Sequence, residues 1–275
     1  MRPRDPGSWR SPARRLSAVA VTAALSGMAP ASAQAPAYTA AQLDCAIYRG
    51  SIESRIHTVS GSQQSQETAG RDALVVFRAG AKGDGSLQME SWFDSLALWR
   101  QGGGRRDEAE TDGLIGGRFR GTLTRNGSYV AEDRPFIPDE VTAFADISDP
   151  PVDLLPPLPP LPLAVRASYI DSSGWSFRRL SDSSAGGQVI RRYELGGHRE
   201  HAATRTLGDS LTFEVVVKEE EAGTMAWSDR EGPLRWRRQI VARSTVPAGG
   251  TIRRPIRTRL EQAIVSERVG RCNPE

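Results

Sequence analysis

The clearest indications of the fold are the runs LTFEVVV at residues 211–217 and LRWRRQIV at residues 234–241. Both runs are short, rich in β-branched or aromatic residues, and alternate in part between apolar and polar positions, which is typical of half-buried strands. Similar runs occur earlier, as ALVVF at 73–77 and SLQMESW at 86–92, and Gly, Ser, Asp and Asn separate them. The sequence therefore predicts an all-β protein, mainly antiparallel, built as a curved sheet, a sandwich or an open barrel.

Three local signals add detail to this architecture. Asn126-Gly127 separates two strand-like runs and predicts a type I′ hairpin turn, which needs residues that tolerate a positive φ. One short helix is predicted at Pro138–Asp146, where acidic residues occupy the first turn and apolar residues recur at helical spacing. The Leu-Pro run at 154–162 lacks the backbone donors of a central strand. It predicts a stiff, extended, Pro-rich crossover whose leucines pack on the domain.

The segments before and after the proline run share a sequence pattern. Trp-x-Asp, a short gap, Leu, and then Trp and Arg occur around Trp92 and Trp99 and again around Trp227 and Trp236. We therefore predict an internal duplication, in which two similar halves share a core that neither half could bury alone.

Residues 1–33 have the layout of an export signal peptide. Five arginines precede or begin an apolar run that ends at Leu25, and Ala31-Ser32-Ala33 provides a small-x-small cleavage site. The apolar run is far shorter than the roughly 20 residues of a spanning helix, so we expect no membrane span after the leader is removed. We predict a periplasmic or secreted bacterial protein, exported by the general secretory route. Its single β-rich domain, 34–275, divides into a first half (34–148), a Pro-rich connection (149–166) and a second half (167–275).

Cys45 and Cys272 are the only cysteines and lie near the two ends of this domain. In an oxidising compartment this placement predicts one structural disulfide. The bridge would bring the two Cα atoms to about 5–6 Å, so the first and last strands should lie side by side. Two independent redox-active thiols are the alternative, but they lack the Cys-x-x-Cys spacing.

The charge balance argues against nucleic-acid binding. The whole chain carries a formal charge of +3, and the five arginines and one aspartate of residues 1–33 account for +4. Subtracting the two leaves about −1 for residues 34–275. Because a nucleic-acid footprint needs a basic face on the mature domain, we predict no nucleic-acid partner.

One tetrapeptide matches a catalytic signature. Gly208-Asp209-Ser210-Leu211 resembles the motif of the GDSL esterases and lipases, in which the serine is the nucleophile. No histidine follows Ser210 to act as its base, and a serine without a positioned base is a weak nucleophile. The tetrapeptide is more simply a turn that enters a strand, and we predict no catalytic site here.

The remaining polar clusters also favour plain structural interpretations. His198 and His201 follow Gly196-Gly197, which predicts an exposed polar loop rather than a zinc site. The acidic clusters at 107–112 and 219–221 are predicted to be solvated charges in turns, because the ligand register of a calcium loop is missing. We therefore predict no metal site and no cofactor.

Five tryptophans remain after the leader is removed, and they are the candidate ligand-binding residues. They can pack in the core, where an indole buries a large area and finds one partner for its N–H. Alternatively, they can line an apolar cavity or a sugar-stacking face of a concave β structure. The candidates are Trp92, Trp99, Trp175, Trp227 and Trp236.

A family resemblance covers the middle third of the chain. GLIGGRF at 113–119, the Asn126-Gly127 turn, the predicted helix and the Leu-Pro run resemble a group of uncharacterised secreted bacterial β-rich proteins. The resemblance implies a β-rich fold and an exported location, and it implies no chemistry because that group has no established activity.

The leading functional hypothesis is a non-enzymatic envelope protein that binds a small apolar or amphiphilic molecule, or an envelope partner. The first alternative is a secreted hydrolase that uses carboxylates, for which Glu90 and Asp94 beside Trp92 are the nearest candidates. The second alternative is a structural or adhesive module, in which edge strands would matter more than a cavity.

Overall fold

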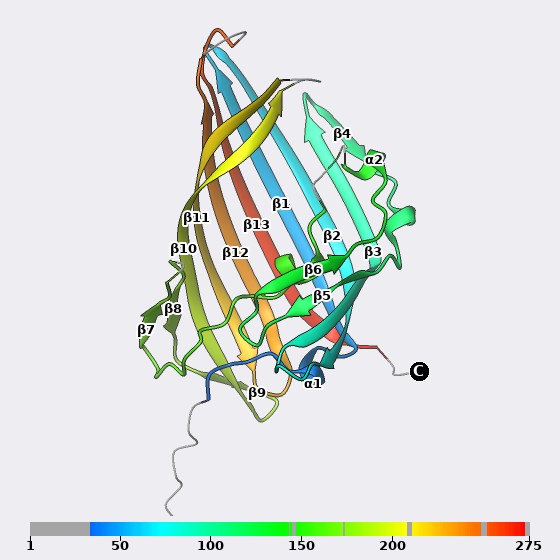
Figure 1. Ribbon diagram of the computed structural model, residues 1–275, viewed down its shortest axis with the longest axis vertical. Helices are drawn as coiled ribbons and strands as arrows, with labels where there is room; N and C mark the ends of the chain where they lie inside the picture. Colours follow the sequence, from blue (N-terminus) through cyan, green and yellow to red (C-terminus); the bar gives the residue numbers. More distant parts are fainter. Residues whose placement is uncertain are drawn as a thin grey trace, which may run out of the picture. The chain divides into compact units, whose positions relative to one another are not determined.

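The computed structural model describes residues 34–272, apart from 143, 145–146, 173, 208–210 and 249–251. The predicted signal peptide lies outside the described residues. One antiparallel sheet of 13 strands dominates the domain, in the order β6-β5-β3-β2-β1-β13-β12-β11-β10-β8-β7, with β4 paired to β3 and β9 paired to β10 (Figure 1). The strands are β1 (Ala46–Ser60), β2 (Gln63–Ala81), β3 (Leu87–Gly102), β4 (Arg105–Glu108), β5 (Phe119–Leu123), β6 (Tyr129–Asp133), β7 (Ser168–Ile170), β8 (Ser176–Arg179), β9 (Ser183–Ala185), β10 (Gln188–Leu207), β11 (Leu211–Ser228), β12 (Gly232–Val246) and β13 (Ile256–Arg271).

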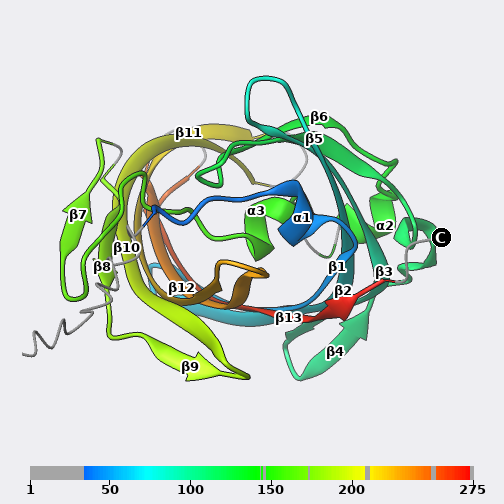
Figure 2. The same ribbon diagram turned by 90° about the horizontal axis from the view of Figure 1, so that it is seen from below.

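The sheet is strongly curved and does not close, since β6 and β7 form its two ends. Figure 2 shows the strands as an arc around a space that contains two short helices, α1 and α3. The predicted curved, antiparallel β architecture is thus confirmed, whereas the prediction of one helix is too low. The short helices are α1 (Ala40–Leu43), the 3-10 turn η1 (Asp112–Leu114), α2 (Asp139–Thr142) and α3 (Pro150–Leu154).

The predicted helix at 138–146 is present as α2, a single turn over Asp139–Thr142. Positions 143, 145 and 146 of the predicted range lie outside the described residues. Within the described part of the chain, no helix is long and apolar enough to cross a lipid bilayer.

The disulfide joins Cys45 to Cys272 as predicted, with the two Cα atoms 5.0 Å apart. The backbone N–H of Cys272 also donates to the carbonyl of Cys45 at 2.8 Å. Directly beyond the bridge, β1 and β13 pair along their whole length, from Ala46 opposite Arg271 to Ser60 opposite Ile256. The first and last long strands therefore lie side by side at the centre of the sheet.

The Pro-rich segment connects β6 to β7, which are opposite ends of the sheet. It crosses inside the arc of strands (Figure 2) and begins with α3, whose last residue, Leu154, is the first residue of the run at 154–162 that we predicted to be extended. The helix is permitted because its prolines stand in the first turn, where no backbone N–H needs a partner. Leu154, Leu155 and Leu158 are buried, so the prediction that the leucines pack on the domain is confirmed for these three, whereas Leu161 is 53% exposed.

The hairpin between β5 and β6 forms where Asn126-Gly127 predicted it, but with a different turn. Gly127 has a φ of 95°, whereas Asn126 is not among the described residues with a positive φ. The N–H of Gly127 donates to the carbonyl of Thr124, and the N–H of Thr124 donates to the carbonyl of Ser128. This is the type I turn followed by a glycine bulge, because the loop is longer than the two residues of a type I′ hairpin.

The four tryptophans that suggested a duplication occupy unlike positions. Trp92 and Trp99 both lie on β3, while Trp227 lies on β11 and Trp236 on β12. Trp227 and Trp236 are fully buried, and Trp92 and Trp99 are partly exposed. The internal duplication and its boundaries stay a prediction.

Candidate functional site

Side chains alternate between the two faces of each long strand, and contacts with α3 show which face is concave. A Cβ atom on Gly50 of β1 would meet the Leu154 side chain of α3 at 2.6 Å. Arg71 of β2 forms an ion pair with Asp153 of the same helix, with both side chains about one-tenth exposed. The side chains that point into the arc are therefore those of the even-numbered residues of β1 and, near Arg71, those of the odd-numbered residues of β2.

The concave face has a closed half and an open half. On one side of α3, the buried side chains of the sheet pack against α1, α3 and the Leu-Pro segment in a single core. Aromatic pairs such as Tyr48–Phe77 and Phe93–Phe119 stand edge to face in this core, with ring centroids 5.4 and 5.6 Å apart. This half is filled by protein.

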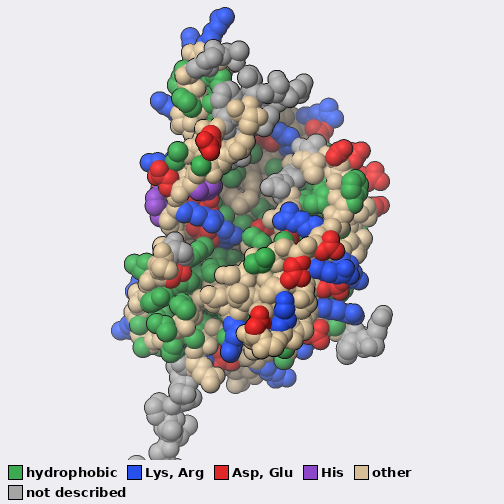
Figure 3. All heavy atoms as spheres, in the orientation of Figure 1, with side chains coloured by type: hydrophobic (Ala, Val, Ile, Leu, Met, Phe, Trp, Pro, Cys, Tyr) green, Lys and Arg blue, Asp and Glu red, His purple; other side chains and the backbone are tan. Residues whose placement is uncertain are grey.

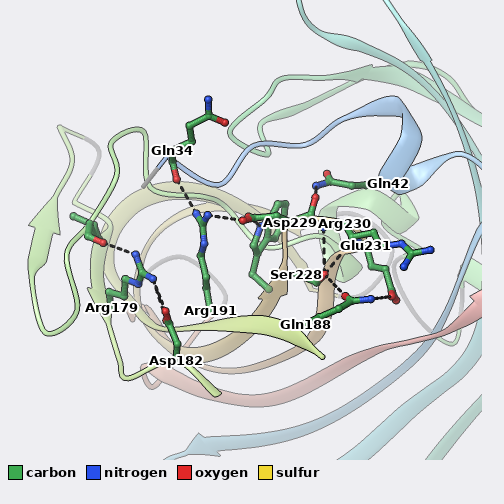
Figure 4. Close-up of polar contacts among 12 residues, drawn as sticks. Gln34, Gln42, Arg179, Asp182, Gln188, Arg191, Ser228, Asp229, Arg230 and Glu231 are labelled. Atoms are coloured by element: carbon green, nitrogen blue, oxygen red, sulfur yellow. Dashed lines mark hydrogen bonds and ion pairs between the residues drawn. The ribbon is translucent and has the colours of Figure 1, made fainter. Parts of the chain in front are cut away.

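The far end of the closed half is sealed by polar contacts of the N-terminal segment (Figure 4). Gln42 donates from Nε2 to the carbonyl of Asp229 at 2.9 Å, and Arg191 donates to the carbonyl of Gln34 at 2.7 Å. Arg191 also forms an ion pair with the Asp229 carboxylate at 2.5 Å. These contacts fasten residues 34–42 across the bottom of the sheet.

On the other side of α3, the concave face is only partly covered by the described residues: Ile56, Leu260 and Ala242 are partly exposed, whereas Ile264, Ile240, Val215, Val217 and Val246 are buried. Figure 3 shows the upper part hollowed between β10–β11 on the left and β3–β4 on the right, with hydrophobic side chains in the recess. We define the open half by its inward-facing residues: Ile52, Ser54, Ile56 and Thr58 (β1); Ile256, Thr258, Leu260, Gln262 and Ile264 (β13); Arg238, Ile240, Ala242, Ser244 and Val246 (β12); Val215, Val217, Glu219 and Glu221 (β11); and Arg199, His201 and Ala203 (β10).

The strand register sorts the floor of the open half into rows. Ile56, Leu260 and Ala242 lie opposite one another on three neighbouring strands and form an aliphatic row, and all three are partly exposed. The next row outward carries hydroxyls, since Ser65 of β2 pairs with Thr58, Thr58 pairs with Thr258, and Thr258 pairs with Ser244.

Beyond the hydroxyl row, Ile256 and Val246 form a second aliphatic row. Val246 also belongs to a small apolar cluster with Val215 and Val217 of β11. The floor therefore offers apolar contact on both sides of a line of hydrogen-bonding groups.

An ion-pair cluster lies on the β10–β11 side of the floor. Glu221, with a side chain only 4% exposed, pairs with Arg238, which donates from NH2 to Glu221 Oε2 at 3.1 Å. Glu219 accepts from Nε of the more exposed Arg199 at 3.1 Å. Burial raises the pKa of the Glu221 carboxyl, and the nearby Arg238 guanidinium acts in the opposite direction.

This cluster corrects two sequence-based predictions. Residues 219–221 were predicted to be solvated turn charges, but they lie within β11, and Glu221 is buried. His198 and His201 were predicted to lie in a loop, but they lie in β10. Because strand residues alternate, His201 faces inward and His198 faces outward, so the two imidazoles do not share a face.

Of the five candidate tryptophans, Trp175 borders the open half. Its ring carbons would lie 3.6 Å from a Cβ on Gly197 of β10. Together with Arg199, Glu219 and Glu221 it encloses a pocket of about 20 Å³, which is room for about one water molecule. This indole therefore covers the edge of the ion-pair cluster.

The other four tryptophans lie away from the hollow. Trp227 and Trp236 are enclosed in the closed core. Trp92 and Trp99 face the convex side, where the guanidinium of Arg118 lies 3.6 Å from the centroid of Trp92 and that of Arg106 lies 4.6 Å from the centroid of Trp99.

The candidate carboxylates of a hydrolase also lie on the convex side of β3. Glu90 accepts from Nε of Arg120 at 3.1 Å, and Asp94 is exposed. Residues Gly208–Ser210 of the GDSL-like tetrapeptide lie outside the described residues. Across the described chain, no group of three or more His, Cys, Asp or Glu side chains is placed to hold a metal ion.

Comparisons with known proteins give no family. No protein-family model matches the chain, and no curated protein matches it. A structure described as showing lipid–protein interactions in lipovitellin is similar over 85% of this chain, with a TM-score of 0.36 and 7% identity, and the chain spans only 26% of the lipovitellin chain.

Two smaller proteins are similar at lower scores. The match to a DUF1329 family protein from Desulfovibrio piger covers 81% of this chain and 85% of that protein's chain, with a TM-score of 0.16 and 10% identity. The match to MucB, in a structure of its complex with MucA, covers 80% of this chain and 89% of the matched chain, with a TM-score of 0.11 and 8% identity. Because all three TM-scores are below 0.5, these likenesses assign neither a ligand nor a function to this chain.

Proposed function

We propose that this chain is an exported bacterial envelope protein that binds a small amphiphilic molecule in the open half of the concave face. The observation that carries the proposal is the partly exposed aliphatic row of Ile56, Leu260 and Ala242 on an inward-curving surface. Apolar side chains on a concave face are the usual lining of small-molecule sites. The predicted leader and the Cys45–Cys272 disulfide support an oxidising, exported location.

The dimensions suit a single lipid-like chain. The open half extends from Ile52 to Ser60 along β1, which at about 3.3 Å per residue is roughly 26 Å. One leaflet of a bilayer has a hydrocarbon thickness of about 15 Å, half the usual core, so one acyl chain fits along the floor.

The polar groups favour an amphiphile over a pure hydrocarbon. The hydroxyl row at Thr58, Thr258 and Ser244 crosses the floor between two aliphatic rows. A ligand without acceptors or donors would cover these hydroxyls and leave them without partners, which costs free energy. A ligand with an ester, amide or hydroxyl beside its chain satisfies them.

The test is native mass spectrometry of the oxidised protein, purified without detergent, followed by titration with an uncharged naphthylamine fluorophore. We expect a discrete adduct that organic extraction removes, and saturable fluorophore binding to the extracted protein. Leu260→Gln removes an apolar contact of about 60 Å², worth about 1.5 kcal/mol, and should weaken fluorophore binding roughly tenfold.

Val216→Gln is the matched control, because Val216 is 52% exposed and faces the convex side of β11. Thermal melts of both variants check that the fold is intact. A bare protein mass together with fluorophore binding that both variants leave unchanged would contradict a site on this floor.

A further inference from the structure

The end of the sheet next to the open half carries a basic tip. We define the basic tip as Arg253 and Arg254, in the segment that joins β12 to β13, together with Arg257 at the start of β13; all three are exposed. The side chain of Arg254 lies against Gly61 in the turn between β1 and β2. Figure 3 shows basic side chains at this upper end.

The described residues of the tip, and of the ends of β1, β2, β12 and β13 beside it, carry no acidic side chain. Residues 242–260 and 56–66, which form the tip and the strand ends that support it, contain no Asp or Glu. Among the described residues, none of the three arginines of the basic tip has an ion pair. The nearest ion pairs in the sheet are Arg259–Glu261 and Arg243–Glu220, further down the strands.

The basic tip and the open half are contiguous. Ser60, Ile256 and Val246 pair side by side in the last row of the concave floor, directly beside the segment that carries the arginines. The opposite end of the concave face is sealed by residues 34–42. The basic tip therefore stands at one margin of the opening into the open half.

We propose that the basic tip docks on the surface of an anionic phospholipid membrane, with the open half facing the bilayer. The choice of a membrane as the partner rests on the proposed function. Arginines near an anionic lipid surface are attracted by its negative potential. A membrane also supplies amphiphilic molecules, with one or more chains, that suit the floor of the open half. The contact therefore turns the opening of the open half toward the membrane that supplies the ligand.

The experiment is flotation of the exported full chain, with its N-terminus determined by mass spectrometry, on vesicles of phosphatidylcholine with one-fifth phosphatidylglycerol. Pure phosphatidylcholine vesicles and high salt are the reference conditions. Each arginine near the surface contributes roughly fivefold to partitioning, so the triple variant Arg253→Gln/Arg254→Gln/Arg257→Gln should bind anionic vesicles roughly a hundredfold more weakly.

The matched control removes three exposed arginines from the convex face, as Arg49→Gln/Arg235→Gln/Arg237→Gln. These side chains also have no ion pair among the described residues, and they lie toward the closed end. We expect this variant to bind vesicles within about threefold of the original protein, since only the tip is oriented by the proposed contact.

Two further readouts separate the membrane contact from ligand binding. The tip variant should keep the ligand adduct, whereas Leu260→Gln should lose it and still bind anionic vesicles. Equal binding to anionic and neutral vesicles, or equal losses in the tip and control variants, would overturn the docking proposal. If the original protein carries no ligand adduct in native mass spectrometry, the ligand site is overturned. The flotation result then still decides whether the basic tip binds anionic vesicles.

Discussion

Arg71→Met should detach α3 from the wall of the sheet. Arg71 and Asp153 have side chains that are 9% and 10% exposed, so little water reaches either charge. After the substitution, the buried Asp153 carboxylate keeps only the hydroxyl of Ser148 as a described donor. Removing one partner of a buried pair costs about 3–5 kcal/mol, because the other charge is left without compensation.

A double-mutant cycle measures this effect. Urea unfolding with the disulfide intact gives the free energy of unfolding for Arg71→Met, Asp153→Leu and the double variant. Because apolar groups of similar volume can replace a buried pair at little cost, the double variant should recover most of the loss. The exposed pair Arg55–Glu53 serves as the reference, with an expected coupling below about 1 kcal/mol.

A loss of less than about 1 kcal/mol for Arg71→Met, or a double variant whose loss equals the sum of the single losses, would contradict this prediction. Either outcome means that the pair of Arg71 with Asp153 does not hold α3 against the sheet. In the same variants, Arg134 still pairs with the fully buried Asp149 at 2.6 Å, so the start of the crossover keeps one anchor.

Two further predictions concern the buried carboxyl and the disulfide. Burial raises the pKa of Glu221, so its contribution to stability is complete below the ordinary carboxyl pKa and is lost as pH rises through the raised pKa. Thermal melts between about pH 4 and pH 8 should therefore show the original protein losing stability relative to Glu221→Gln as pH rises, and a difference that is constant with pH would contradict this. Replacing Cys45 and Cys272 together by serine opens a loop of 227 residues and should lower the free energy of unfolding by up to about 5 kcal/mol. An unfolding midpoint in urea that matches that of the oxidised protein would exclude a stabilising role for the bridge.

The strands, the disulfide and the crossover were predictable because each depends on short-range chemistry. Period-two runs such as 211–217 specify strands, and proline at 156–162 excludes a central strand whatever surrounds it. Two cysteines near the two ends of the predicted domain leave a single intramolecular pairing. The pairing in turn placed β1 beside β13, which is the central pair of the sheet.

The candidate site was not predictable, because period two reveals that a strand has two faces but not which face is concave. Trp92 and Trp236 look alike in sequence, yet Trp92 is on the convex side and Trp236 is in the core. Three successive glutamates at 219–221 suggested a turn, and only the structure shows that Glu221 lies opposite Ile240 of β12, buried and in an ion pair with Arg238. Gly196-Gly197 likewise suggested a loop, but Gly197 is a strand residue with the indole of Trp175 packed beside it.

The position of the crossover explains why one half of the concave face is filled and the other half is open. The chain must join β6 to β7 at opposite ends of the sheet, and its leucines are buried only if it passes inside the arc. Inside the arc, α3 and the Leu-Pro run cover one half of the long strands, and the ion pair of Arg71 with Asp153 marks the boundary. Ile56 and Leu260 beyond that boundary are covered by no described segment of the chain, and apolar surface on a concave wall is stabilised when it leaves water. A bound amphiphile supplies that cover, and the basic tip at the same end of the sheet determines which surface the opening meets.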